Sequence, residues 1–249
     1  MLNIFNCDLH VHTCLSPCAE LDMHPTALVR KAIEAKLDMI AICDHNSSAN
    51  VPYVMKAAQT TNLKILPGME ITSSEEVHLL AIFDSLSNLI LMQNLIDQHL
   101  TGENDEELFG VQADVNEMGE VEGINKQLLI GATDLSLDTL IDYIHQWDGL
   151  AIAAHIDRES FSVLSQLGFI DDEANFDALE ITPRTGFDRA RIIYPELGKF
   201  PFIVSSDSHF INDIGKTSTR MNLLEPTFSE LKMALRRQNG RFVMEQPQV

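Results

Sequence analysis

Residues 8–13 read Asp8-Leu9-His10-Val11-His12-Thr13. The first two of these residues end the first predicted strand, residues 3–9, and the other four follow it. Because side chains two residues apart point to the same face of a strand, His10 and His12 direct both imidazoles toward one point. Neutral imidazoles and carboxylates are the ligands that Zn²⁺, Mn²⁺ and Fe²⁺ accept in proteins. The motif therefore predicts part of a metal site at the end of a strand.

Short apolar or β-branched runs recur along the rest of the chain. Six further strands are expected at residues 39–43, 65–67, 77–83, 150–154, 178–181 and 202–205. Amphipathic helical patterns lie between or after them, at residues 25–36, 49–61, 86–100, 136–146, 160–167 and 227–238. This alternation predicts an α/β fold with a largely parallel sheet and helices outside it, either doubly wound or closed into a barrel.

Five of the other six predicted strands also carry histidine or carboxylate at an end. The residues concerned are His45, Glu70, His78, His155, Asp207 and His209. One histidine at a strand end is usually structural, but six such strand-associated sites are hard to explain in that way. Active sites of parallel α/β folds gather at the carboxyl ends of the strands. A polynuclear metal site at that edge of the sheet is the expectation.

The composition limits the classes of function. The chain has 249 residues with 17 Lys and Arg against 37 Asp and Glu, a formal net charge of −20. That charge argues against long duplex nucleic acid as a partner, whereas a small anionic substrate can bind if metal ions supply positive charge. The sequence contains neither an export signal nor an apolar run of the ~18 residues that a membrane span needs, so we expect a cytoplasmic protein without a membrane partner. The four cysteines all lie in the first fifth of the chain and cannot form a disulfide framework.

One acidic segment interrupts the alternation. No Lys or Arg occurs between Ile65 and Asn125, and residues 111–115 and 120–124 flank Asn116-Glu117-Met118-Gly119, a predicted hairpin. We interpret residues 101–133 as an acidic insertion within a single domain, residues 1–249. It is expected to be a solvated loop, or alternatively a lid or a surface for a partner.

Six motifs in order resemble the polymerase and histidinol phosphatase (PHP) superfamily: DLHVHT, ICDHNS, PGMEIT, EVHLLAIF, AAHID and SSDSH. The resemblance extends from Asn6 to about Gly215. It implies a distorted seven-stranded (β/α)7 TIM-like barrel, in agreement with the seven strands counted above. It also implies a hydrolase that binds two to three divalent metal ions and cleaves phosphoesters.

The resemblance assigns the metal ligands residue by residue. The first metal would take His10, His12, Glu70 and Asp207, and Glu70 would bridge to a second metal held by His78 and His155. A third would take His45 and His209 with an acidic residue or histidine from the loop after His12. That loop departs from the pattern, since it carries Pro17 and Cys18 there. Either the Cys18 thiolate replaces the usual ligand and favours zinc, or this is a two-metal enzyme with a weak third site.

The mechanism that the resemblance implies starts from a hydroxide shared by two cations that Glu70 bridges, with His155 and Asp207 among the catalytic ligands. The hydroxide attacks phosphorus. Arg158 and Arg184 are candidate phosphate clamps, because guanidinium binds phosphate oxygens bidentately, or else surface ion pairs. Asp8 and Asp44 either orient ligand histidines or accept hydrogen bonds from backbone amides.

Two classes of function follow. As an enzyme, the protein would cleave a small phosphomonoester such as histidinol phosphate or a nucleotide, or remove nucleotides from the 5′ ends of short oligonucleotides. The alternative is a non-catalytic, metal-binding regulatory module that docks a partner through the acidic segment. The bridging Glu70 and the complete ligand set favour chemistry.

Overall fold

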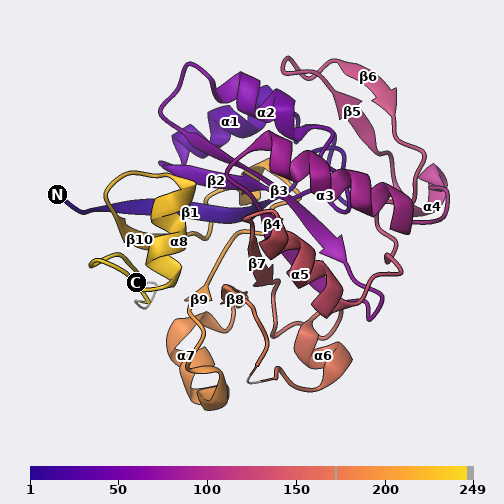
Figure 1. The fold of residues 1–249 in the computed structure, drawn as a ribbon. Helices are drawn as coiled ribbons and strands as arrows, with labels where there is room; N and C mark the ends of the chain where they lie inside the picture. Colours follow the sequence, from indigo (N-terminus) through magenta and orange to yellow (C-terminus); the bar gives the residue numbers. More distant parts are fainter. Residues whose placement is uncertain (172, 246–249) are drawn as a thin grey trace.

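The computed structural model describes residues 1–171 and 173–245. Its main feature is a nine-stranded sheet in the order β11-β10-β1-β2-β3-β4-β7-β8-β9 (Figure 1). The strands are β1 (Asn3–Val11), β2 (Met39–Ile42), β3 (Lys64–Thr72), β4 (His78–Ile82), β7 (Leu150–Ala153), β8 (Ala178–Glu180), β9 (Phe202–Ile203), β10 (Thr219–Leu223) and β11 (Phe242–Val243). The α/β prediction is confirmed.

The predicted number of seven strands is wrong. The seven expected strands are all present, but β10 pairs antiparallel with the far side of β1 and β11 pairs antiparallel with β10. In β10 the buried residues alternate with Arg220 and Asn222, and β11 is two residues long. β10 contributes only two apolar residues, Met221 and Leu223, so neither strand carries an apolar run strong enough to be recognised in the sequence.

The strand β4 runs opposite to both of its neighbours. β1, β2 and β3 are parallel, as are β7, β8 and β9, whereas β4 is antiparallel to β3 and to β7. The first residue of β4, His78, therefore pairs with Thr72, the last residue of β3. This reversal places the beginning of β4 at the same edge of the sheet as the ends of the parallel strands.

The sheet curls into a nearly closed barrel. An isolated parallel bridge joins Val11 at the end of β1 to Ser208, which follows β9. The His12 amide donates a hydrogen bond to the Ser208 carbonyl oxygen at 3.1 Å. The chain that leaves the last parallel strand is thereby returned to the first strand.

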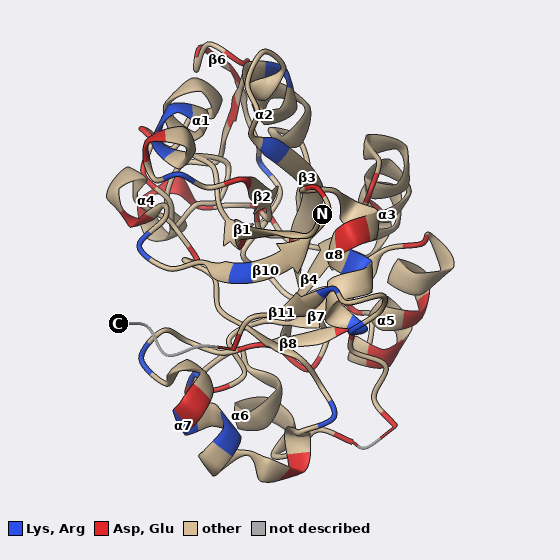
Figure 2. Ribbon diagram, turned by 90° about the vertical axis from the view of Figure 1, so that its left-hand side faces the viewer, with Lys and Arg blue, Asp and Glu red and all other residues tan. Residues whose placement is uncertain are grey.

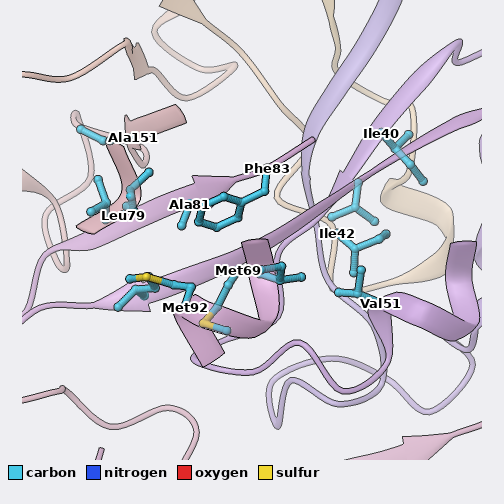
Figure 3. Packing of buried hydrophobic residues seen from close by; sticks show 14 of the residues in the cluster. Ile40, Ile42, Val51, Met69, Leu79, Ala81, Phe83, Met92 and Ala151 are labelled. Carbon is cyan, nitrogen blue, oxygen red and sulfur yellow. The ribbon is translucent and has the colours of Figure 1, made fainter. Parts of the chain in front are cut away.

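The two faces of the sheet build separate apolar clusters. The outer cluster packs Ile40, Ile42, Met69 and Phe83 against the surrounding helices, which contribute residues such as Val51 and Met92 (Figure 3). These helices are α1 (Pro25–Glu34), α2 (Val51–Ala58), α3 (Leu86–His99), α5 (Leu137–Gln146), α6 (Val163–Leu167) and α7 (Gly186–Ile193). Side chains of the opposite strand parity form the inner cluster, which α8 (Phe228–Leu235) joins: Leu66, Leu80, Ile152, Ala178, Ile203, Phe228 and Leu231.

Local signals set several helix starts. Pro25 occupies the first turn of α1, and the hydroxyl groups of Ser85 and Ser136 accept hydrogen bonds from backbone amides at the starts of α3 and α5. Proline and serine are favoured there because the first amides of a helix have no partner inside it. None of the described helices is both long and apolar enough to span a bilayer.

The acidic segment folds against the body of the protein. It contains α4 (Glu106–Phe109) and an antiparallel pair, β5 (Ala113–Val115) and β6 (Val121–Ile124). The Ala113 amide donates to the Cys14 carbonyl oxygen at 3.1 Å, and the buried Asn50 side chain bonds the backbone of Ala113 and Val115. The backbone of this segment is therefore attached to the loop after β1 and to the start of α2.

Candidate metal centre

A bulge in β1 turns His10 and His12 toward the inside of the barrel. Asp8 pairs with Ile40 and Val11 pairs with Ile42, so β1 has one more residue than β2 between these pairs. An inserted residue shifts the alternation of faces. Val11 joins the outer cluster, and the Nε2 atoms of His10 and His12 approach each other to 3.1 Å.

Glu70 lies at the centre of the site. It is 1% exposed and belongs to β3, at the same strand parity as Leu66 of the inner cluster. Both carboxylate oxygens face imidazole nitrogens from several strands. Oε2 is 3.4 Å from His10 Nε2, 3.4 Å from His12 Nε2 and 3.1 Å from His45 Nδ1, and Oε1 is 2.8 Å from His78 Nδ1 and 3.3 Å from His155 Nε2.

Asp207 and His209 complete the cluster from the chain after β9. Asp207 Oδ1 is 3.3 Å from both His10 Nε2 and His12 Nε2. The His209 ring stacks on the His12 ring with 4.1 Å between centroids, and its Nδ1 donates to the Asp207 carbonyl oxygen at 2.9 Å. The eight strand-end residues that the sequence singled out thus converge on one point at the inner face of the barrel.

The donor set fits divalent metal ions. Three groups of residues place ligand atoms within 4.8 Å of one another: His10, His12 and Glu70; His45, Glu70 and His78; and His12, His45 and His209. Nδ1 of His45 and of His78 is buried and has no hydrogen-bond partner among the described residues, although each lies close to Glu70. Buried, unpaired imidazole nitrogens beside a carboxylate are the arrangement that a transition-metal ion satisfies.

These groups differ in part from the ligand sets that the family resemblance implied. His45 lies with Glu70 and His78, and His12 lies with His45 and His209. Cys18 belongs to none of the three groups found among the described residues, and its side chain is exposed. The third group thus contains His12 in addition to His45 and His209, the two residues that the resemblance assigned to the third metal.

The electrostatics hold Glu70, His12 and His45 in the form that binds a metal ion. Burial would raise the pKa of Glu70, but the imidazoles of His78 and His10 outweigh burial and hold that pKa well below its usual range. Burial lowers the pKa of His12 to about 4 and also holds the pKa of His45 well below its ordinary value. The carboxylate of Glu70 thus stays charged while the two rings stay neutral.

His10 behaves differently from the other two rings. Burial acts to lower its pKa, but the carboxylates of Asp207, Glu180 and Glu70 raise it well above its ordinary value. A metal ion bound at His10 Nε2 must therefore displace a proton from the metal-free site.

A second layer of polar groups orients His12 and its loop. Nδ1 of His12 lies 2.9 Å from the Ser16 hydroxyl oxygen, and that hydroxyl donates to Asp44 Oδ1 at 2.7 Å. Asp44 Oδ1 also accepts from the Thr13 amide at 2.7 Å. Asp44 therefore holds both the backbone of the loop and, through Ser16, the ring of His12.

Asp8 supports the chain that carries Asp207. Its Oδ1 accepts a hydrogen bond from the Ser206 amide at 2.9 Å. Of the two roles considered for Asp8, the structure shows the contact with a backbone amide.

Two residues beside the ligands were not anticipated. Glu180, 2% exposed on β8, places Oε2 3.0 Å from His10 Nδ1. Its signal in the sequence was a carboxylate at the end of an otherwise apolar strand. Phe161 stacks on the His78 ring with 4.7 Å between centroids, and its carbonyl oxygen accepts from the His78 amide at 2.9 Å. No sequence pattern pointed to Phe161.

The two predicted phosphate clamps differ in position. The Arg158 guanidinium donates to Asp207 Oδ2, and its side chain is 44% exposed. Arg184 follows β8 and is exposed; its side chain makes no hydrogen bond or ion pair with the described residues. Only Arg158 is in contact with the cluster.

Comparisons with known proteins agree with this arrangement. A family model described as PHP domain matches residues 8–180. Among proteins of curated function, no match to the sequence was found.

Several solved structures share the fold. The lesion-specific endonuclease PfuEndoQ from Pyrococcus furiosus superposes with a TM-score of 0.76 at 19% identity over 97% of this chain, and endonuclease Q in complex with a 27-mer duplex containing an abasic lesion with 0.75 at 20%. This chain spans 58% and 59% of the lengths of those two chains. A metal-dependent phosphoesterase, described as putative, from Bifidobacterium adolescentis has a TM-score of 0.56 at 20% identity, with 93% of this chain and 96% of that chain covered.

Proposed function

The chain belongs to the PHP domain family of phosphoester hydrolases, and from this premise we propose that it hydrolyses a small phosphomonoester, a nucleotide or a short oligonucleotide with divalent metal ions. The observation that carries the proposal is the position of Glu70. One buried carboxylate faces five imidazoles, two from the end of β1 and one each from the ends of β2, β4 and β7. A purely structural carboxylate has no need of so many imidazole rings around it.

Divalent ions held by these ligands would lower the pKa of water toward neutrality and offset the charge of a phosphoryl group. Residues of the chain would hold and position these ions. Glu70 presents one oxygen to each half of the histidine cluster, so it can serve two neighbouring cations. Asp207 faces His10 and His12 on one side and Arg158 on the other.

Arg158 is the better-supported phosphate clamp. Its guanidinium contacts Asp207 with one nitrogen, and its partial exposure leaves other N–H groups free to reach a phosphate oxygen. Arg184 follows β8 at the same edge of the barrel and could contact a more distant part of the substrate. Both arginines would bind and orient substrate rather than exchange protons, because guanidinium keeps its charge.

The exclusion of long duplex nucleic acid, which rested on the net charge and on the scarcity of basic residues, does not stand. Endonuclease Q, whose fold this chain shares, has a 27-mer duplex in its complex. The basic residues of this chain are also unevenly placed: eleven of the 17 lie between Arg158 and Arg241, and Figure 2 shows several of them on α7, α8 and β10. Cleavage within a nucleic-acid strand is therefore the second candidate function.

The decisive experiment is a substrate panel on protein reconstituted separately with Zn²⁺, Mn²⁺ and Fe²⁺. The panel includes p-nitrophenyl phosphate, histidinol phosphate, a nucleoside monophosphate, a short 5′-labelled single strand and a duplex with an abasic site. We expect metal-dependent release of phosphate or of mononucleotides, and its loss in Glu70→Gln. Cleavage of the duplex alone would select the second candidate.

Metal analysis of the same preparations should show at least two divalent ions per chain. Replete protein that binds these ions but hydrolyses no substrate with any of the three metals would favour the regulatory module. A replete preparation with one ion or none would contradict the proposed site.

A further inference from the structure

Glu180 links two of the candidate metal ligands through a single oxygen. Its Oε2 lies 3.0 Å from His10 Nδ1 and accepts a hydrogen bond from the His155 amide at 3.1 Å. The backbone of Glu180 also contributes, since its carbonyl oxygen accepts from the Ile156 amide at 2.8 Å. His10 belongs to β1 and His155 follows β7, so Glu180 joins two strands that are not neighbours in the sheet.

The backbone of His155 needs such support. His155 has a backbone φ of +28°, a positive value that residues other than glycine seldom adopt. Residues held in such conformations persist where the surrounding structure overdetermines them. Here Glu180 binds the amide of His155 with its side chain and the amide of the next residue with its backbone.

The contact between His10 Nδ1 and Glu180 selects the tautomer of the His10 ring. When Nδ1–H donates to Glu180, the lone pair of the neutral ring is on Nε2, which is the atom that faces Glu70 and Asp207. A carboxylate on the remote nitrogen also makes the imidazole a better donor to a metal.

We propose that Glu180 is a positioning residue that presets His10 Nε2 and His155 Nε2 for one shared metal cluster. The proposal rests on the metal-dependent function above. Glu180 lies behind the ligands, on the inner face of β8, and the hydrogen bonds of its side chain to described residues go to His10 and to the His155 amide. A buried carboxylate costs free energy by desolvation, and the two ligand contacts account for its presence in the inner layer of the barrel.

The test compares three variants by metal affinity. Glu180→Gln keeps an oxygen that can accept from the His155 amide but removes the negative charge beside His10, whereas Glu180→Ala removes both contacts. Glu230→Gln is the matched control, because Glu230 is also buried, accepts from the Leu224 amide and pairs with Arg241 away from the cluster. Dissociation constants for Zn²⁺ and Mn²⁺ are measured by chelator competition on the full chain.

We expect Glu180→Gln to weaken the binding of at least one metal ion by about 10- to 100-fold, the usual effect of losing a partner behind a metal ligand. Glu180→Ala should weaken it further, and Glu230→Gln should leave it unchanged. Thermal unfolding of the metal-free proteins shows whether each variant folds. If Glu180→Ala fails to fold, the comparison of the two Gln variants carries the test.

A purely structural role would give a different result. It would lower the unfolding temperature of metal-free Glu180→Gln and leave its metal affinity equal to that of the wild type, and this would overturn the proposal. Because metal affinity is measured without a substrate, the outcome is independent of the proposed function: a protein that binds metal but hydrolyses nothing would refute hydrolysis alone.

Discussion

At the scale of the residue, Glu70 is the most connected group of the site. Its two oxygens serve different sets of rings, so loss of its charge affects every candidate metal position except the one formed by His12, His45 and His209. His209, by contrast, belongs only to that last group.

The first prediction compares these two residues. Glu70→Gln should lower kcat/KM for a small phosphoester by more than His209→Ala does, because Gln at position 70 no longer supplies the charge that two neighbouring cations share. Steady-state kinetics on metal-replete protein, with metal content measured for each variant, makes the comparison. A larger loss in His209→Ala would mean that the group containing His209 carries the nucleophile.

The second prediction concerns Asp8, whose contribution to the free energy of unfolding should depend on pH. Burial raises the pKa of Asp8 to about 7, despite hydrogen bonds from Ser206 that lower it. The folded protein therefore retains a proton that the unfolded chain, with an ordinary aspartate pKa near 4, releases. Asp8 must then favour folding most at low pH, and its contribution must fall as pH rises from about 4 to about 7.

Asp8→Asn tests this sign on the metal-free protein. The free energy of unfolding of the wild type minus that of Asp8→Asn should decrease across this pH range by up to about 4 kcal/mol, the value of three pKa units. Urea unfolding in the presence of chelator at several pH values gives the difference. A difference that stays constant with pH would show that Asp8 is ionised in the folded state throughout.

At the scale of the element, the acidic segment depends on close backbone contact with the loop after β1. Gly110 has a φ of +101°, and a Cβ there would lie 2.3 Å from the Pro17 carbonyl oxygen. Neither the backbone conformation nor the space admits a side chain.

Gly110→Ala should therefore destabilise the protein by about 1–3 kcal/mol and expose the segment to protease. Gly123→Ala, in β6 of the same segment, is the control, because a Cβ there makes only ordinary contact with Asp114. Urea unfolding and limited proteolysis measure both effects. Equal behaviour of the two variants would show that the segment does not depend on this contact.

At the scale of the whole molecule, the basic residues are unevenly distributed along the chain. No Lys or Arg lies between Ile65 and Asn125, while most basic residues follow residue 157. A small substrate that binds through metal ions and one or two arginines displaces few counterions, whereas each phosphate neutralised on a duplex adds about −0.9 to the logarithmic salt slope.

We therefore expect kcat/KM for a nucleoside monophosphate to change by less than about threefold between 50 and 200 mM salt. The same measurement on a short single strand and on a duplex gives the slopes for comparison. A steep slope together with preference for the duplex would show that the basic residues after residue 157 form a continuous binding surface.

The sequence alone determined which residues meet in the candidate site. His10, Glu70, His155 and Asp207 could be identified because each lies at or next to the end of a strand, and the strand ends of such a fold gather at one edge. Even the reversed strand β4 fits, since His78 at its beginning is the residue nearest that edge.

Only the tertiary structure decided what surrounds those residues. Glu180 is a single carboxylate in a short strand, and nothing local shows that it faces His10, which is 170 positions away. Cys18 follows the motif histidines closely in the sequence but belongs to none of the three groups found among the described residues, and the loop that carries it is held by contacts of Asp44 and Ser16 that no local pattern predicts. The strands β10 and β11 were missed for the same physical reason: their pairing with β1 and with each other, rather than their own apolar pattern, stabilises them.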